Sequence, residues 1–412
     1  MKFTKLKNMF TKVSMTLALT SFAFAIQSAI PVEAASIPTN LRQVDSSSNS
    51  VEISGSNFDA NADDDDYTAY LSKDNGRTWF ASDRAYYSDY DNTFRINNLD
   101  SGTHYLVKIG SEGRYSQPIA VITDLDSSTS CVTSLTQIGV TTKSATISWR
   151  GAAGADGYEI RINNQVVGTT SQTSYAIPAN YIKPTYTYVY VYPYIATANY
   201  RTTGYGFDDT YVKLLPEKPV VVLDTWYKYI EHLSLDIKTT SYYEGYESVF
   251  YNAKGKRIKR GENLSGLANA PMTSIYSAQV RTYVKINGKK YYSSWSDKTY
   301  AVAQPEVKVK KTTDKKTKAK TLTLSWNTIK GASGYDIYVS ASGTKVKKFK
   351  KVASVKANKK SYVVKKVAGK KVSKNKNYFV YVVAKKKVGS KTMTSSHTYC
   401  YSVKGEGYTS AR

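Results

Sequence analysis

The sequence predicts an all-β protein in which four β-sandwiches follow one another as beads on a string after a cleaved signal peptide. The first observation is a repeat: Ile147-Ser-Trp149 is followed eight residues later by Tyr158-Glu-Ile160, and Leu324-Ser-Trp326 is followed at the same spacing by Tyr335-Asp-Ile337. The second is the alternation of apolar and polar residues in short runs, which is the period of a strand. The third is a set of Pro-containing and polar joints spaced about 90 residues apart.

Residues 1–34 have the pattern of a signal peptide. A lysine-containing start precedes an apolar stretch from Val13 to Ile26, and Val32-Glu-Ala34 places small residues before the predicted cleavage point. The alternative is a membrane anchor, but this stretch is shorter than the roughly 20 residues that span a bilayer. We therefore expect a secreted, extracellular protein associated with the cell envelope, with no transmembrane segment after cleavage.

The remaining chain divides at its joints into four predicted sandwiches and a tail. The third repeats the motif with Ile237 in the Trp position and Tyr246 in the Tyr position, whereas the first lacks the Trp. The predicted boundaries are 36–126 for a divergent, acidic domain, 127–217 and 218–304 for the next two, 305–404 for a Lys-rich domain, and 405–412 for the tail.

The repeated residues carry a family resemblance. Trp149 and Trp326 match the B-strand Trp of fibronectin type III domains, and Tyr158 and Tyr335 match their C-strand Tyr. The run 99–109 follows the family pattern Leu-x-x-Gly-Thr-x-Tyr-x-Val. The chain thus resembles the tandem fibronectin type III arrays of exported bacterial proteins. That resemblance implies spacers, adhesive modules or accessories of secreted enzymes, and it implies no particular reaction.

The charge of the chain is concentrated at one end. Residues 305–412 hold 27 Lys and one Arg against four acidic residues, whereas residues 36–126 hold 15 acidic residues against seven basic ones. A dense cationic surface accumulates polyanions by counterion release. The alternative is a soluble surface on which lysines block aggregation of edge strands. The predicted polyanion-binding residues are Lys347, Lys348, Lys350, Lys351, Lys365, Lys366, Lys370, Lys371, Lys385, Lys386 and Lys387.

These lysines predict a tether to anionic cell-wall polymers or acidic glycans in an adhesive spacer array, with other surface proteins as further partners. Sequence-specific binding of nucleic acid is not expected, because a single Arg in this region leaves little means of reading bases.

Tyrosine is unusually frequent, with 37 copies in the chain. In the run 186–194, alternation places tyrosines on one face and Thr187, Val189 and Val191 on the other, and either face is able to form the core. Alignment with the later repeats favours the valines inside. The alternative function is then a carbohydrate-binding accessory protein whose site is formed by Tyr186, Tyr188, Tyr190 and Tyr192. Cross-strand packing of the rings is the structural explanation of the same pattern.

Two acidic motifs lie in the first predicted sandwich. Ser72-Lys-Asp74-Asn-Gly76-Arg-Thr78-Trp79 fits the Asp-box pattern, and a single copy indicates a structural hairpin turn. The run Asp63, Asp64, Asp65 and Asp66 is a weak Ca²⁺ candidate, since it lacks the spacing and glycine of an EF-hand loop.

Catalytic residues are not evident in the sequence. His104, His232 and His397 fall in three different predicted sandwiches, and no His/Cys group has zinc-ligand spacing. We therefore expect no enzymatic activity, no catalytic residue, no metal and no cofactor. Cys131 and Cys400 are predicted to be unpaired, because a bridge between them requires the array to fold back on itself.

Overall fold

The computed structural model describes residues 36–59, 66–111, 113–226, 232–316, 318–342 and 348–411, so the predicted signal peptide lies outside the described residues. The chain divides into a smaller unit (1–45, 51–98 and 105–121) and a larger unit (46–50, 99–104 and 122–412). In the described residues the strands form four successive pairs of sheets and one additional two-stranded ribbon. The all-β sandwich fold predicted from the sequence is thereby confirmed.

The first sandwich has a four-stranded sheet where each of the others has a three-stranded one. One sheet has the order β1 (Thr39–Ser46), β2 (Val51–Ser56), β6 (Thr93–Ile96), β5 (Ala85–Ser88). The other has the order β4 (Phe80–Ala81), β3 (Thr68–Ser72), β7 (His104–Ser111), β8 (Arg114–Tyr115), and β9 (Ile119–Ile122) also pairs with β7. Ile53, Phe94 and Val107 are fully buried between the two sheets, which is the packing that alternating strands produce.

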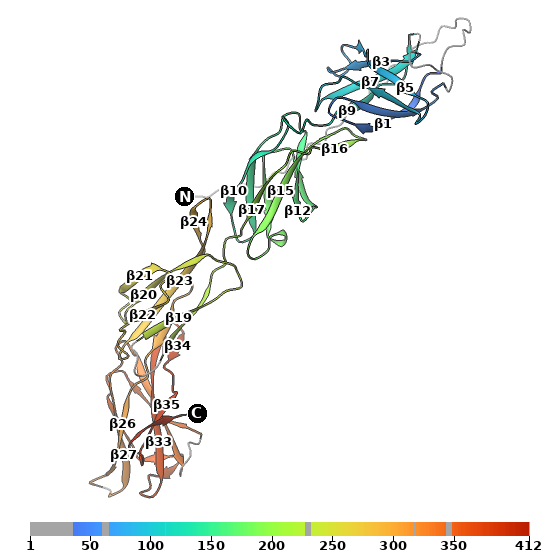
Figure 1. The fold of residues 1–412 in the computed structure, drawn as a ribbon. Coiled ribbons are helices and arrows are strands. Elements are labelled where there is room, and N and C mark those ends of the chain that lie inside the picture. The colour runs from blue at the N-terminus through green and yellow to red at the C-terminus, as the bar shows by residue number, and fades with distance from the viewer. Residues whose placement is uncertain are drawn as a thin grey trace, which may run out of the picture. The chain divides into compact units, whose positions relative to one another are not determined.

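The second sandwich pairs a three-stranded sheet with a larger one. The smaller sheet contains β10 (Thr133–Val140), β11 (Ser144–Arg150) and β14 (Ser174–Pro178). The larger sheet has the order β13 (Gln165–Thr170), β12 (Gly157–Ile162), β15 (Thr187–Ala196), β16 (Arg201–Thr203), with β17 (Asp208–Val212) also paired to β15. Strands β10, β12, β15 and β17 are labelled in Figure 1. A short 3₁₀ turn, η1 (Ala179–Tyr181), connects β14 toward β15.

The third sandwich repeats this arrangement. Its small sheet contains β18 (Val220–Trp226), β19 (His232–Lys238) and β22 (Gly266–Ala268). Its large sheet has the order β21 (Arg257–Glu262), β20 (Gly245–Tyr251), β23 (Ile275–Ile286), β24 (Lys289–Tyr292), with β25 (Thr299–Val302) also paired to β23.

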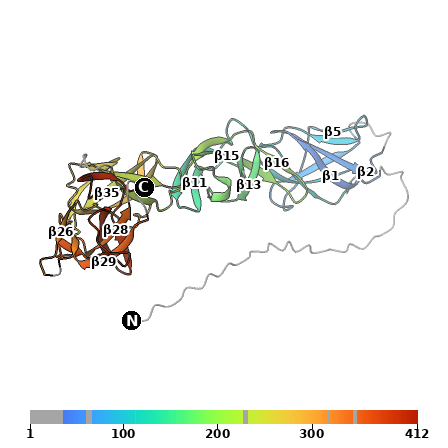
Figure 2. The same ribbon diagram turned by 90° about the horizontal axis from the view of Figure 1, so that it is seen from below.

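The fourth sandwich has the same two sheets with additions. The small sheet contains β26 (Val307–Thr313), β27 (Lys320–Trp326) and β30 (Ser361–Val364). The large sheet has the order β29 (Lys350–Lys356), β28 (Gly334–Ser342), β33 (Asn377–Val388), β35 (Tyr399–Ser402), β36 (Gly407–Ser410), and β34 (Lys391–Thr394) pairs with β33. β28 and β29 lie side by side in Figure 2. The ribbon is β31 (Lys366–Val367) with β32 (Lys370–Lys371).

The segment 405–412, predicted as a tail, contains part of this sheet. β36 pairs with β35 over four residues, and the Tyr408 hydroxyl donates to the Val307 carbonyl at 2.8 Å. Ala411 packs against the buried cluster of Phe379, Tyr381 and Cys400. The pairing of β36 with β35 was not visible in the sequence, because a single four-residue strand has little periodicity of its own.

The repeated Trp and Tyr residues are buried in the cores of the second and fourth sandwiches. Trp149 packs against Tyr158 with ring centroids 5.3 Å apart, and Trp326 packs against Tyr335 at 5.7 Å. Both tyrosine hydroxyls accept a backbone hydrogen bond from the turn between the two strands, from Ala152 in one case and from Ile329 in the other. In the third sandwich the corresponding residues, Ile237 and Tyr246, are only partly buried.

The buried cluster of the fourth sandwich extends into the third. Ile275, Val302 and Ala303 of the third belong to the same buried cluster as Trp326 and Ile329. Backbone hydrogen bonds reinforce the contact: the amide of Ile275 donates to the carbonyl of Lys330 at 3.0 Å. The buried cluster around Trp149, in contrast, contains only residues of the second sandwich.

No helix within the described ranges is long and apolar enough to cross a membrane.

Candidate functional site

A carboxylate held between two cations recurs on the outer face of each large sheet in the second, third and fourth sandwiches. Each carboxylate directly follows the repeated Tyr in sequence, so it points away from the core that the Tyr enters. The three carboxylates belong to Glu159, Glu247 and Asp336, and all three residues are largely buried. The sequence contains a signal for them, the acidic residue after Tyr in every copy, but the cations come from other parts of the chain.

The partners differ in kind from one sandwich to the next. Glu159 contacts Arg161 and Arg201, each at 2.5 Å. Glu247 contacts Arg281 at 2.7 Å and also Arg260. Asp336 contacts Lys385 at 2.6 Å and Lys351 at 3.6 Å. It also accepts a hydrogen bond from the Ser354 hydroxyl at 2.6 Å.

The electrostatics of these clusters are those of satisfied ion pairs. Burial raises the pKa of Asp336, but the hydrogen bonds from Lys385 and Ser354 outweigh it, so that the pKa lies below its ordinary value. The same balance, with Arg260 and Arg281 as donors, lowers the pKa of Glu247. With both cations engaged, the clusters hold neighbouring strands together, and the lowered pKa keeps the carboxylates of Glu247 and Asp336 ionised near neutral pH.

The tyrosine strand β15 has the predicted register. Thr187, Val189 and Val191 are buried, whereas Tyr188 is 52% exposed and Tyr186, immediately before the strand, is 49% exposed. The outward tyrosines fall into two pairs with different surroundings.

Tyr190 and Tyr192 are half-buried because other side chains lie on them. The ring of Phe207 lies 4.9 Å from Tyr192 and 5.9 Å from Tyr190, and the Arg161 guanidinium lies 4.5 Å from the centre of Tyr192. Tyr186 and Tyr188 instead group with Tyr211 of β17, which pairs directly with Tyr188. Tyr211 was not among the predicted site residues, because only strand pairing brings it there.

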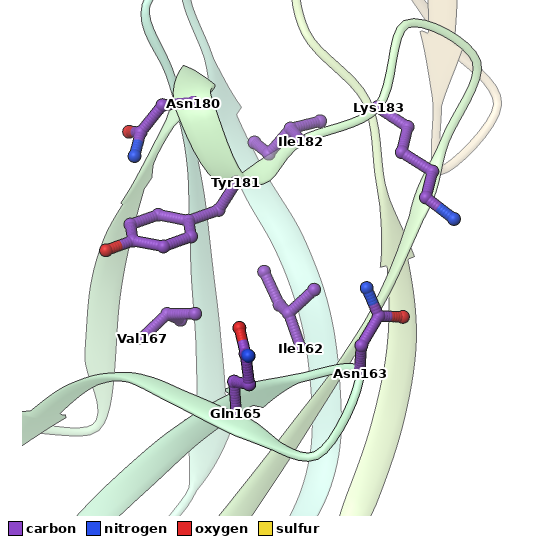
Figure 3. A pocket seen from close by; sticks show the side chains of 8 residues that line it. All are labelled: Ile162, Asn163, Gln165, Val167, Asn180, Tyr181, Ile182 and Lys183. Carbon is purple, nitrogen blue, oxygen red and sulfur yellow. The ribbon is translucent and has the colours of Figure 1, made fainter.

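A pocket of about 330 Å³ lies at one end of the second sandwich, between the β12–β13 hairpin and η1 (Figure 3). Ile162, Val167 and Ile182 form its apolar part. Its polar lining consists of Asn163, Gln165, Asn180, Tyr181 and Lys183. The sequence contained no recognisable signal for it, since the lining comes from two loops about 15 residues apart.

The predicted polyanion-binding lysines lie on several strands of the fourth sandwich. Lys347 lies outside the described residues. Lys351 and Lys385 are the cations of the Asp336 cluster, and Lys386 donates to the Gly331 carbonyl at 3.3 Å. The remaining predicted lysines are exposed: Lys348, Lys350, Lys365, Lys366, Lys370, Lys371 and Lys387.

The Asp-box motif forms the turn between β3 and β4. Asp74 accepts hydrogen bonds from the amide of Thr78 at 2.9 Å, from its hydroxyl at 2.6 Å and from the Ser72 hydroxyl at 2.8 Å. These bonds, led by that of the Thr78 hydroxyl, hold the pKa of Asp74 well below its usual range. The Trp79 indole donates to the Gly76 carbonyl at 3.0 Å. The Asp74 carboxylate and the Trp79 indole therefore find their hydrogen-bond partners within the turn itself.

The other candidate residues are placed as follows. Asp63, Asp64 and Asp65 lie outside the described residues, and Asp66 is exposed. Over the described ranges, no three His, Cys, Asp or Glu side chains gather in a way that is able to hold a metal ion. The ring of His397 stacks on Tyr381 at 5.2 Å. Cys131 and Cys400 are both free thiols, and burial raises the pKa of the Cys400 thiol to about 11.

No protein-family model matches the chain, and no curated protein matches it. Solved structures do match, among them the crystal structure of the FN1–FN3 domains of chicken CNTN1. That structure is 15% identical, and the match covers 65% of this chain and 98% of that chain with a TM-score of 0.22. At this identity and TM-score the match carries no argument about function. The sheets themselves define the class, a multidomain array of fibronectin type III-like β-sandwiches.

Proposed function

We propose that the chain is an exported, non-catalytic array that attaches to anionic polymers of the cell envelope through its fourth sandwich. The observation that carries this proposal is the excess of 27 Lys over four acidic residues in 305–412. Asp336, one of those four, is already engaged by Lys351 and Lys385. The exposed lysines of this sandwich therefore have few carboxylates of their own to neutralise them.

The chemistry of the surface sets the class of ligand. Lys is a flexible point charge that binds phosphate without bidentate geometry, so the surface favours a polymer with repeated anionic groups over one shaped anion. Anionic cell-wall polymers and acidic glycans both have this property. The preceding sandwiches then act as the spacer and adhesive surface of the array.

The test measures binding of the full mature chain to immobilised poly(glycerol phosphate) across a salt series. We expect retention at about 50 mM NaCl and release by a few hundred millimolar, because released counterions oppose binding as salt rises. Changing six exposed lysines to Gln weakens binding and flattens its salt dependence. The six are Lys348, Lys350, Lys365, Lys366, Lys370 and Lys371.

The matched control removes the same charge from the second and third sandwiches. It changes six other exposed lysines to Gln: Lys143, Lys254, Lys256, Lys259, Lys289 and Lys298. If both variants lose binding equally, net charge alone is responsible and the fourth sandwich is not the tether. If the wild-type chain is retained equally at all salt concentrations, the electrostatic mechanism is wrong.

A further inference from the structure

The pocket of the second sandwich and its exposed tyrosines lie at the same end of β15. β12 pairs with β15 in a register that places Arg161 opposite Tyr190. At the start of β15, the backbone amide of Lys183, which lines the pocket, donates to the Thr187 hydroxyl at 2.7 Å, and Thr187 lies between Tyr186 and Tyr188 in sequence. Tyr188 in turn pairs with Tyr211 on β17. The rings of Tyr186, Tyr188 and Tyr211 therefore form a cluster close to the pocket lining, with the ring of Tyr186 5.8 Å from that of Tyr188 and 6.1 Å from that of Tyr211.

The exposed area of the rings is sufficient for a ligand to stack on them. Tyr186 is 49% exposed, Tyr188 52% and Tyr211 53%, whereas Phe207 and Arg161 cover the neighbouring pair. A half-exposed tyrosine offers an apolar ring face and a hydroxyl that donates and accepts hydrogen bonds. Such a surface suits a molecule that alternates C–H faces with polar groups.

The pocket adds hydrogen-bonding groups of the same neutral character. Asn163, Gln165 and Asn180 each present an amide that both donates and accepts (Figure 3). None of these three side-chain amides is hydrogen-bonded to another described residue. Ile162, Val167 and Ile182 supply an apolar wall beside the amides, and Lys183 is the one charged residue of the lining. A volume of about 330 Å³ lies at the lower end of ligand pockets and accommodates one sugar residue.

We propose that this surface binds a neutral oligosaccharide of acetamido sugars, with one residue in the pocket and its neighbours on Tyr186, Tyr188 and Tyr211. The acetamido group matches the pocket because its N–H and C=O pair with side-chain amides while its methyl group packs on the isoleucines and Val167. The site lies in a different sandwich from the exposed lysines and takes a ligand without charge. It is therefore independent of the polyanion proposal.

The experiment titrates the full mature chain with the β-1,4-linked hexamer of N-acetylglucosamine in about 0.5 M NaCl, where charge attraction is screened. Calorimetry should detect binding, and binding of the cellulose hexamer, which lacks the acetamido groups, should be at least roughly tenfold weaker. Two variants should each weaken the first interaction by roughly tenfold or more: Tyr188→Ser, and Gln165→Ala with Asn180→Ala. Thermal melting of each variant checks that the second sandwich stays folded.

The matched control is Tyr205→Ala, because Tyr205 is 81% exposed on the same sandwich and lies outside the pocket lining. Unchanged affinity in this variant supports the assigned surface. The proposal is overturned if the N-acetylglucosamine hexamer does not bind, or if Tyr205→Ala weakens binding as much as Tyr188→Ser. Equal binding of the two hexamers overturns the assignment of acetamido sugars.

Discussion

The large sheets of the second and fourth sandwiches have corresponding central strands, and their outer faces differ. β15 of the second alternates buried and outward residues, so its tyrosines remain accessible. β33 of the fourth is buried on both faces from Asn377 to Ala384. Tyr381 in this strand is only 6% exposed, because three rings cover it. The centroids of these rings lie 4.9 Å (Tyr338), 4.5 Å (Phe349) and 5.2 Å (His397) from that of Tyr381.

This difference shows how one scaffold acquires two surface chemistries. In the fourth sandwich the chain continues into β36, and Ala411 packs on the cluster that contains Tyr381 and Cys400. With its aromatic residues enclosed, this sandwich presents lysines to solvent. On the outer face of the second sandwich Phe207 packs on Tyr190 and Tyr192, whereas the rings of Tyr186, Tyr188 and Tyr211 remain about half exposed.

The largest expected effect tests the two faces of β15. Val189→Asp should unfold the second sandwich, because Val189 is fully buried and a carboxylate without a partner in the core costs several kcal/mol. Circular dichroism and calorimetry of the full chain measure the loss of its transition. Tyr188→Ser is the control and should leave that transition in place. A variant Val189→Asp that melts normally would contradict the register.

The next effect tests how far each core extends. Trp326→Ala should destabilise the fourth sandwich by about 3–5 kcal/mol. Because Ile275, Val302 and Ala303 belong to the same cluster, the transition of the third sandwich should fall with it. Trp149→Ala should lower only the transition of the second. Calorimetry separates these outcomes, and an unchanged third sandwich in Trp326→Ala would show that the shared cluster does not couple the two.

Substitutions on the outer faces should give a smaller but unequal effect. Tyr381→Ser should destabilise the fourth sandwich by about 3 kcal/mol, since it removes a buried ring and leaves a cavity. Tyr188→Ser should change the free energy of unfolding of the second by less than about 0.5 kcal/mol, as is usual at exposed positions. Urea unfolding compares the pair. Equal costs would mean that the two faces are enclosed alike.

The smallest effect concerns pH. The pKa of Asp336 is lowered in the folded state, so its ion pairs stabilise the fourth sandwich above the unfolded pKa of about 3.9. This contribution is lost as pH falls through the folded pKa. The melting temperature of the wild type should therefore exceed that of Asp336→Asn near neutral pH, and the difference should shrink in acid. The second sandwich, in the same trace, is the internal control. A difference that grows in acid would reverse the assigned sign.

Sequence patterns predicted the parts of the site that depend on neighbours along the chain. The turn around Asp74 follows from hydrogen bonds within five residues of it. The outward direction of Tyr188 follows from alternation in β15. Tyr211 and the Glu159 cluster were missed, because strand pairing joins their members over tens of residues, and the pocket was missed because two separate loops form it. No local pattern encodes that pairing.

The sequence by itself determined the sandwich fold, the repeated Trp–Tyr cores and the inward and outward faces of the strands, because alternation and side-chain burial are local properties of an extended chain. It also determined the concentration of lysine in residues 305–412. Only the tertiary structure decided which outward residues stay accessible. Tyr381 and Tyr188 both occupy outward positions, but Phe349 and His397 cover the first, whereas the second remains half exposed.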